Sequence, residues 1–270
     1  MKTLMVVRRM LGALLPAPLR ARWRRWRRVK WEGDFADWAA ARAVCTGYDS
    51  PVILARVLAA ARCVRDDKWA AERDGVRLAD APENKPLQAA MQLAAQAPGG
   101  RLSVLDFGGA LGCNFWPLRR QLEVQNARWA VVEQPHFVAA GRREFQNDQL
   151  RFCASVEECF AQDTPNLLLL LSVLPYLPNP HALLDEVLAR GIPVVMIDRT
   201  GFVDQPTDRL TIQRVPRNIY PASYPCWFFN RERFLAHFAA QYRLRDEWTN
   251  PDGEGSGFVF KGLLFDRVPG

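Results

Sequence analysis

The middle of the chain alternates between short apolar runs and longer stretches in which apolar residues recur at helical spacing. The apolar runs predict strands at 102–107, 128–133, 150–153, 166–172 and 192–198. The amphipathic stretches predict helices at 112–124, 135–146, 155–161 and 180–190. Five strands separated by helices predict an α/β fold built on a doubly wound, mostly parallel sheet.

The pattern changes on both sides of this alternation. On the C-terminal side it predicts a helix at 230–241 and two strands at 242–248 and 257–266, which completes a seven-stranded sheet. Between the fifth strand and that helix, residues 199–229 are rich in Pro, Tyr and Arg, and predict a long loop; loops of this length in compact domains usually have a function. On the N-terminal side, helical patterns at 34–43, 51–64 and 86–97 predict a helical cap over residues 31–100, ahead of the main domain at 101–270.

A glycine-rich turn follows the first predicted strand of the sheet. The strand ends in Asp106, and Gly108, Gly109 and Gly112 follow it, so the backbone there can turn sharply and approach a ligand closely. Glu133 ends the second strand, where an acid can bind a ribose diol. The dinucleotide pattern G-x-G-x-x-G would need a glycine in place of Phe107. The turn instead fits Asp-x-Gly-x-Gly-x-Gly, with Ala110 at the middle glycine, and resembles motif I of class I S-adenosylmethionine (SAM) methyltransferases.

Ligands of open α/β sheets bind outside the carboxyl ends of the strands, and the polar residues at those ends are the candidates for binding SAM. These residues are Asp106, Gly108, Gly109, Gly112, Glu133, Gln134, Ser155 and Ser172. Asp106 can bond the amides of the glycine turn or reach the ammonium group of SAM, and the sequence leaves both open. Gln134 can contact the adenine or simply begin a helix, and Ser155 fits a helix N-cap.

The acceptor of the methyl group is expected to bind beside the predicted loop. Aromatic faces and bidentate donors suit a sugar or phosphosugar, and the candidates are Tyr176, Arg199, Gln213, Tyr220, Tyr224 and Trp227. A hydroxyl acceptor needs a proton acceptor, for which Asp198 and His181 are the candidates. The six cysteines contain no C-x-x-C pair and do not cluster with histidines, so no metal site is expected and free thiols in a reducing cytoplasm are the default.

The net charge of +7 comes from the first thirty residues. Residues 1–30 hold ten Lys or Arg and no acid, with Trp23 and Trp26 interleaved, whereas the rest of the chain is mildly acidic. This basic leader suits peripheral contact with an anionic membrane at its cytoplasmic face, and less well nucleic acid; a tail without a specific role is the other interpretation. Its apolar stretch is too short to span a bilayer.

Several short segments together resemble a family of bacterial class I SAM-dependent methyltransferases associated with surface-polysaccharide biosynthesis. They are Trp31-Glu32-Gly33, Gly47-Tyr48-Asp49, Leu105-Asp106-Phe107-Gly108-Gly109, Val132-Glu133-Gln134, Ile197-Asp198-Arg199-Thr200, Asp208-Arg209-Leu210-Thr211-Ile212-Gln213 and Ser223-Tyr224-Pro225-Cys226-Trp227. The resemblance implies a Rossmann-like fold and SAM as cofactor. Together with the candidate residues, it leads us to expect O-methylation of a sugar in a glycan or glycolipid. The alternative is a binding module of the same fold without catalysis, recruited to membrane or nucleic acid by the leader.

Overall fold

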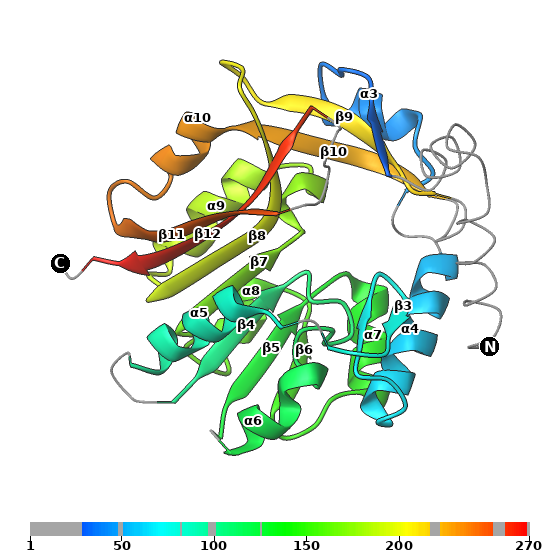
Figure 1. Cartoon of the computed structure of the whole chain (residues 1–270), viewed down its shortest axis with the longest axis vertical. Helices are drawn as coiled ribbons and strands as arrows, with labels where there is room; N and C mark the ends of the chain where they lie inside the picture. The colour runs from blue at the N-terminus through cyan, green and yellow to red at the C-terminus, as the bar shows by residue number, and fades with distance from the viewer. Residues whose placement is uncertain are drawn as a thin grey trace, which may run out of the picture.

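The computed structural model of the chain describes residues 29–47, 51–81, 83–96, 101–124, 126–216, 222–250 and 257–268. Seven of the described strands form the predicted doubly wound sheet (Figure 1). Their order is β6 (Leu150–Cys153), β5 (Arg128–Val132), β4 (Ser103–Phe107), β7 (Leu167–Leu171), β8 (Val194–Val203), β12 (Val259–Arg267) and β11 (Tyr242–Asn250). The first five are parallel, and β12 runs antiparallel to both β8 and β11. The predicted fold class is therefore confirmed.

Both faces of the sheet are buried, which explains the nearly continuous apolar runs of its central strands. In β7, Leu167 and Leu169 pack on one face while Leu168 and Leu170 pack on the other. The first face is covered by α4 (Pro51–Arg65), α5 (Lys85–Ala95), α6 (Arg119–Val124) and α7 (Pro135–Glu144). The second is covered by α8 (Val156–Phe160), α9 (Pro180–Ala189) and α10 (Arg231–Ala236). The predicted helix at 112–124 begins later than expected, with the short 3₁₀ helix η1 (Trp116–Leu118) ahead of α6.

The prediction of a loop over 199–229 is wrong, because most of this segment is sheet. Strand β8 continues to Val203, and β9 (Arg209–Arg214) and β10 (Ser223–Asn230) pair antiparallel to each other. The last residues of β10 pair with the end of β8, so the two strands extend the main sheet. A proline such as Pro225 argues against a strand, because it lacks an N–H for the ladder. Pro225 lies where β10 pairs with β9 alone, a position that tolerates the missing N–H.

The N-terminal segment contains strands besides its predicted helices. Strand β1 (Lys30–Glu32) pairs antiparallel with β9, and α3 (Trp38–Ala43) packs against β9 and β10, in the upper part of Figure 1. Between α4 and α5, β2 (Ala71–Arg73) and β3 (Val76–Leu78) form a hairpin. Its two-residue turn is Asp74-Gly75, with φ of +52° and +73°, as a type I′ turn requires.

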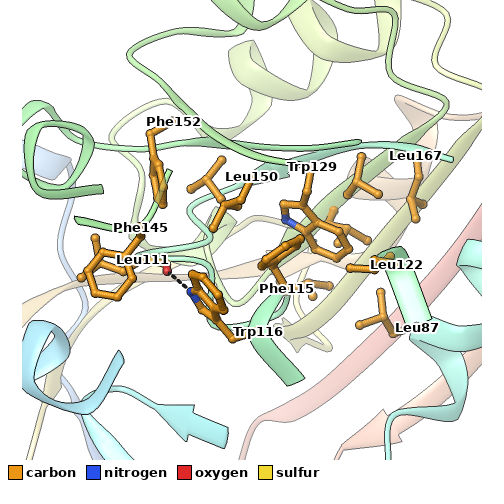
Figure 2. Close-up of a cluster of buried hydrophobic side chains, with 14 of the residues drawn as sticks. Leu87, Leu111, Phe115, Trp116, Leu122, Trp129, Phe145, Leu150, Phe152 and Leu167 are labelled. Atoms are coloured by element: carbon orange, nitrogen blue, oxygen red, sulfur yellow. Dashed lines mark hydrogen bonds between the residues drawn. The ribbon is translucent and has the colours of Figure 1, made fainter. Parts of the chain in front are cut away.

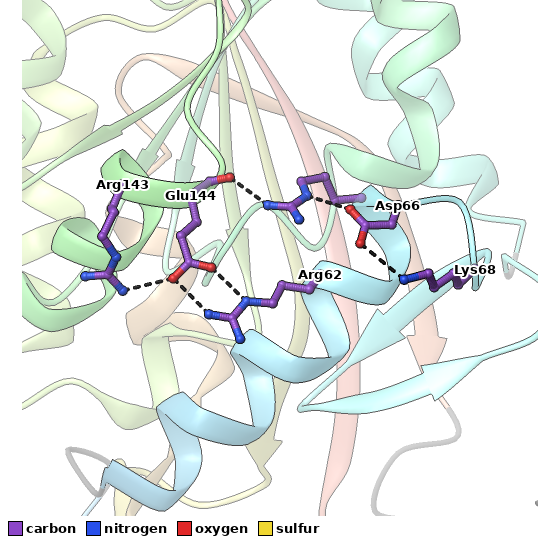
Figure 3. A network of polar contacts seen from close by, with 6 residues as sticks. Arg62, Asp66, Lys68, Arg143 and Glu144 are labelled. Carbon is purple, nitrogen blue, oxygen red and sulfur yellow. Dashed lines mark hydrogen bonds and ion pairs between the residues drawn. The ribbon is translucent and has the colours of Figure 1, made fainter.

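Ion pairs connect α4 to α7 across the edge of the sheet (Figure 3). The Arg62 guanidinium donates to both carboxylate oxygens of Glu144, at 2.7 and 3.0 Å, and Arg65 donates to the Glu144 backbone carbonyl. Hydrogen bonds from Arg62 and Arg143 lower the pKa of Glu144 to about 2. Because the pair is charged at all physiological pH values, it holds the N-terminal segment against the sheet domain.

Within the part of the chain that the structure describes, no helix has the length and apolar character needed to cross a membrane. Most of the basic leader, residues 1–28, lies outside the described residues.

Candidate active site

The backbone of the turn after β4 has positive φ at three positions, and two of them are occupied by the glycines of the sequence pattern. Gly108 and Gly112 have φ of +77° and +85°, and Ala110 has φ of +50°. Ala110 thus adopts the left-handed conformation, which costs a non-glycine residue roughly 1–2 kcal/mol. At Gly108 a Cβ atom would lie 2.5 Å from Val173 Cγ2, so the close approach of this turn to the end of β7 also excludes a side chain.

The carboxylate of Asp106 packs directly against the backbone of this turn. Its carboxylate accepts hydrogen bonds from Asn114 Nδ2 at 3.1 Å and from Trp129 Nε1 at 3.2 Å. A Cβ atom on Gly109 would lie 2.5 Å from Asp106 Cγ, so the turn rests directly on the carboxylate. Burial raises the pKa of Asp106 to about 6. Asp106 does not line the cavity described below, and its hydrogen-bond partners among the described residues are the side chains of Asn114 and Trp129.

A cluster of buried aromatic side chains surrounds the residues that contact Asp106 and the turn (Figure 2). Trp129, which donates to Asp106, is 1% exposed and meets the ring of Phe115 edge to face. Trp116 donates through Nε1 to the Leu111 carbonyl at 3.0 Å, so the residues after the turn are tied back to it. The turn is therefore part of the hydrophobic core and is preorganised before any ligand binds.

A cavity of about 770 Å³ opens above the carboxyl ends of the parallel strands. Ligand pockets commonly have volumes of roughly 300–1,000 Å³. The cavity reaches three regions: the glycine turn with the β2–β3 hairpin, the strand ends of β5 and β6, and the polar side chains of η2 (Leu174–Tyr176), β9 and β10. Five of the eight predicted cofactor residues line it, namely Gly108, Glu133, Gln134, Ser155 and Ser172, whereas Asp106, Gly109 and Gly112 do not. Ala110, in the position of the middle glycine, lines it as well.

Glu133 has the environment expected of a residue that binds a ribose: it lies in the cavity lining, directly after β5. It is half-buried, and its Oε2 accepts from the Gln134 backbone N–H at 2.7 Å. Burial raises the pKa of Glu133 to about 7, and the amides of Gln134 and Ala110 oppose that rise. Gln134 is the N-cap of α7 but makes no side-chain capping bond. Ser155 does cap α8, accepting from Glu158 N at 3.2 Å, and also borders the cavity.

The polar wall on the acceptor side is organised around Gln213, which is 7% exposed. Its Oε1 accepts from Tyr176 Oη and from Trp31 Nε1, both at 2.9 Å, and its Nε2 donates to Tyr224 Oη at 3.2 Å. The rings of Tyr176 and Tyr224 meet edge to face. The structure thus brings together Tyr176, Gln213 and Tyr224, three of the predicted acceptor residues, although they come from three elements.

Both predicted proton acceptors, Asp198 and His181, lie outside the cavity lining, and other residues engage their side chains. Asp198 is 5% exposed, and its carboxylate accepts from Trp248 Nε1 at 3.0 Å, Asn250 Nδ2 at 2.8 Å and Arg199 Nη1 at 3.2 Å. The first two donors come from β11, which β12 separates from β8, and the third comes from the next residue. Together they fix the position of the carboxylate.

His181 also has partners away from the cavity. Its Nε2 lies 2.7 Å from Asp208 Oδ2, and its Nδ1 lies 2.7 Å from Nε2 of His237. This chain of hydrogen bonds joins α9 to α10, which explains why His181 faces away from the strand ends.

Of the three remaining acceptor candidates, only Arg199 is found in the lining of the cavity among the described residues. Trp227 does not line the cavity; it donates to the Leu177 carbonyl at 3.2 Å and stacks on Trp38. Tyr220 lies outside the described residues. Arg199 lines the cavity with a φ of +50°, and its Nε is buried without a hydrogen-bond partner among the described residues.

Sequence reasoning missed the contribution of the N-terminal segment to the cavity. Trp38 and Arg42 of α3, and Glu72, Arg73 and Asp74 of the hairpin, all line it. The Asp74-Gly75 pair between two short alternating runs was the available signal, since Asp-Gly is a strong indicator of a hairpin. Among the described residues, no group of three or more His, Cys, Asp or Glu is placed to hold a metal ion.

No protein-family model and no curated protein matches the sequence. Solved structures do resemble it in fold. The N-terminal domain of EvdMO1, crystallised in the presence of S-adenosylhomocysteine (SAH) and D-fucose, is 17% identical with a TM-score of 0.47, over 77% of this chain and 95% of that one. A SAM-dependent methyltransferase from Methanosarcina mazei is 8% identical with a TM-score of 0.48, over 70% and 100%.

The 1,6-didemethyltoxoflavin-N1-methyltransferase of Burkholderia thailandensis, with bound SAH, is 17% identical with a TM-score of 0.40, over 89% of this chain and 100% of that one. Two of these three structures are methyltransferases by name, and two were crystallised with SAH. At these identities and TM-scores the likeness is one of fold alone.

Proposed function

We propose that this protein is a SAM-dependent methyltransferase that methylates a hydroxyl group of a sugar in a glycan or glycolipid. One observation carries the proposal: a single cavity joins the glycine turn and Glu133 to the polar aromatic wall around Gln213. Donor and acceptor sites that open into one cavity are what a group transfer needs, because the reacting atoms must meet directly.

The residues on the donor side fit SAM. A nucleoside needs a carboxylate for its ribose hydroxyls, and Glu133 ends β5 inside the cavity with its pKa raised to about 7 by burial. Gln134 and Ser155 border the same region, where the adenine would lie. When bound, SAM supplies a methyl group on a sulfonium centre. This chain contributes a turn that lets the ligand approach its backbone closely.

The acceptor side fits a polyhydroxylated ligand. Tyr176 and Tyr224 offer aromatic faces and hydroxyl groups, and Gln213 fixes the positions of both hydroxyls through its amide. Bonds that tie these side chains to one another reduce the entropy lost when a ligand is ordered against them. Since Asp198 and His181 are engaged elsewhere, we propose that catalysis depends on alignment of the acceptor hydroxyl, which can lower the barrier by several kcal/mol.

The function is tested with purified protein, SAM and a panel of free and lipid-linked sugars, followed by mass spectrometry for a gain of one methyl group. The acceptor wall is tested with Gln213→Leu, which removes the partner of both tyrosine hydroxyls, against Tyr242→Phe as a matched control outside the cavity. We expect Gln213→Leu to raise the acceptor KM about tenfold or more without changing SAH affinity. SAM binding without methylation of any sugar, or an unchanged acceptor KM, contradicts the proposal.

A further inference from the structure

Two side chains of opposite charge, Glu72 and Arg199, line the cavity without pairing with each other in the described part of the chain. Glu72 lies on the β2–β3 hairpin, and Arg199 follows the point where β7 and β8 stop pairing. Both line the cavity, and no ion pair between them is found among the described residues. Glu72 has no cationic partner among the described residues, and Arg199, although paired with Asp198 through Nη1, leaves its buried Nε without a partner there. Groups buried in this way are costly, which suggests that a ligand completes the site.

Glu72 is 7% exposed, and only one of its two carboxylate oxygens has a donor. Its Oε2 accepts from the Gly75 backbone N–H at 3.0 Å, and Oε1 accepts from no group of the described chain. Burial raises the pKa of Glu72 to about 7, and the carboxylate of Asp74 adds to the rise. A cationic partner would remove the penalty for burying this charge.

Arg199 presents the edge of its guanidinium that recognises carboxylates. The left-handed backbone at Arg199, with φ of +50°, allows its side chain to occupy the cavity. The guanidinium donates to Asp198 through Nη1, whereas Nε is buried and has no partner in the described chain. The Nε and Nη2 groups form the side edge of the guanidinium, which can bind a planar oxyanion through two parallel hydrogen bonds.

The charges of Glu72 and Arg199 both act on Cys113, which lines the cavity directly after the glycine turn. Burial raises the pKa of the Cys113 thiol, the carboxylates of Glu72 and Asp106 raise it further, and Arg199 lowers it. Glu72 and Arg199 therefore act on one buried position from different elements. Asp106 is unsuited to bind a cation here, because its oxygens are occupied by Asn114 and Trp129 and it lies outside the cavity lining.

We propose that Glu72 and Arg199 together bind the amino-acid end of SAM, Glu72 through its ammonium group and Arg199 through its carboxylate. This assignment rests on the proposed use of SAM. A zwitterion matches one acid and one base that are not paired with each other, and both groups act on Cys113, the residue that follows the glycine turn. The β2–β3 hairpin is then part of the cofactor site.

The test compares two ligands by calorimetry: SAH, which has the amino-acid end, and 5′-deoxy-5′-methylthioadenosine, which lacks it. We expect Arg199→Gln and Glu72→Gln each to weaken SAH about 10- to 100-fold, the range for loss of a charged hydrogen-bonding partner. Binding of methylthioadenosine should change less than about twofold. Arg77→Gln is the matched control, because Arg77 lies on β3 of the same hairpin but outside the cavity lining, and it should leave both affinities unchanged.

Arg199→Lys separates charge from geometry, since lysine keeps the charge and loses the two-pronged edge; it should bind SAH more weakly than the wild type but better than Arg199→Gln. Unchanged SAH affinity in both glutamine variants overturns the assignment. So does an equal loss for both ligands, which would indicate damage to the nucleoside region or to the fold. If the wild type binds neither ligand, the proposed function itself fails; if it binds SAH but methylates no sugar, the acceptor proposal fails while this assignment stands.

Discussion

Gly109→Ala tests whether the glycine turn is confined by the carboxylate beneath it. The new Cβ atom would lie 2.5 Å from Asp106 Cγ and 3.0 Å from Asp106 Oδ1. Asp106 cannot move away freely, because Asn114 and Trp129 hold its oxygens and Trp129 is 1% exposed. The substitution must therefore displace either the turn or a buried, hydrogen-bonded acid.

The magnitude follows from these contacts. Forcing an extra methyl group into a packed site costs roughly 1–3 kcal/mol. Weakening the bonds of a buried carboxylate adds about 1–3 kcal/mol. We expect a loss of about 2–5 kcal/mol in the free energy of unfolding. In a chain of this size that corresponds to a fall in Tm of roughly 5–15 °C. SAH affinity should fall as well, since the displaced turn borders the cavity.

Ala110→Gly is the matched control on the next residue. It relieves the left-handed strain of Ala110, whose φ is +50°, but loosens the unfolded chain. The two effects are each about 1 kcal/mol and of opposite sign, so the stability should change by less than about 1 kcal/mol. Both variants are measured by thermal denaturation and by calorimetry with SAH. Wild-type Tm and SAH affinity in Gly109→Ala, or equal damage in Ala110→Gly, would refute the reasoning.

The remaining predictions concern the nucleoside, its pH dependence and the leader. Glu133→Ala removes the carboxylate proposed to bind the ribose and should weaken SAH by about 2–4 kcal/mol in calorimetry; unchanged affinity contradicts the assignment. Burial raises the pKa of Glu133 and of Glu72 to about 7, and the ionised forms are the ones that bind, so wild-type SAH affinity should fall about tenfold or more from pH 8 to pH 6. Glu133→Gln should flatten this profile, and a flat wild-type profile is the contrary result. In liposome flotation the full chain should bind anionic but not neutral vesicles, at about 1 kcal/mol per basic residue near the surface. Deletion of residues 1–30 should abolish this binding, and equal capture of the truncated chain disproves the tether.

The sheet and the donor side of the site could be predicted because their signals are local. The five leucines of β7 are buried on both faces, and an unbroken apolar run is what such a strand requires. The glycine turn and Glu133 are determined by backbone conformation and by strand ends, both of which neighbouring residues specify. Short segments therefore suffice to predict the sheet and to place the glycine turn and Glu133 at the ends of their strands.

The proton acceptors could not be predicted, because their environments depend on distant residues. Asp198 stands at the end of a central strand, as a catalytic acid often does, yet its partners Trp248 and Asn250 arrive about fifty positions later on β11. His181 is likewise engaged by His237 from α10. Position at a strand end shows that a side chain is near the crevice; only its partners show whether it is available for chemistry.

The two sides of the cavity also differ in how far apart in the sequence their residues lie. The region proposed for the nucleoside is built from the consecutive strand ends of β5 and β6. The acceptor wall is instead assembled from residues that are remote in sequence: Trp31 of β1 and Tyr176 of η2 both bond Gln213 of β9. Because β1 pairs with β9, the segment ahead of the sheet domain positions the hydrogen bonds that we propose for acceptor recognition. Trp31→Phe would remove one bond to Gln213 without entering the cavity lining, so an effect on acceptor KM alone would mark the N-terminal segment as a determinant of acceptor choice.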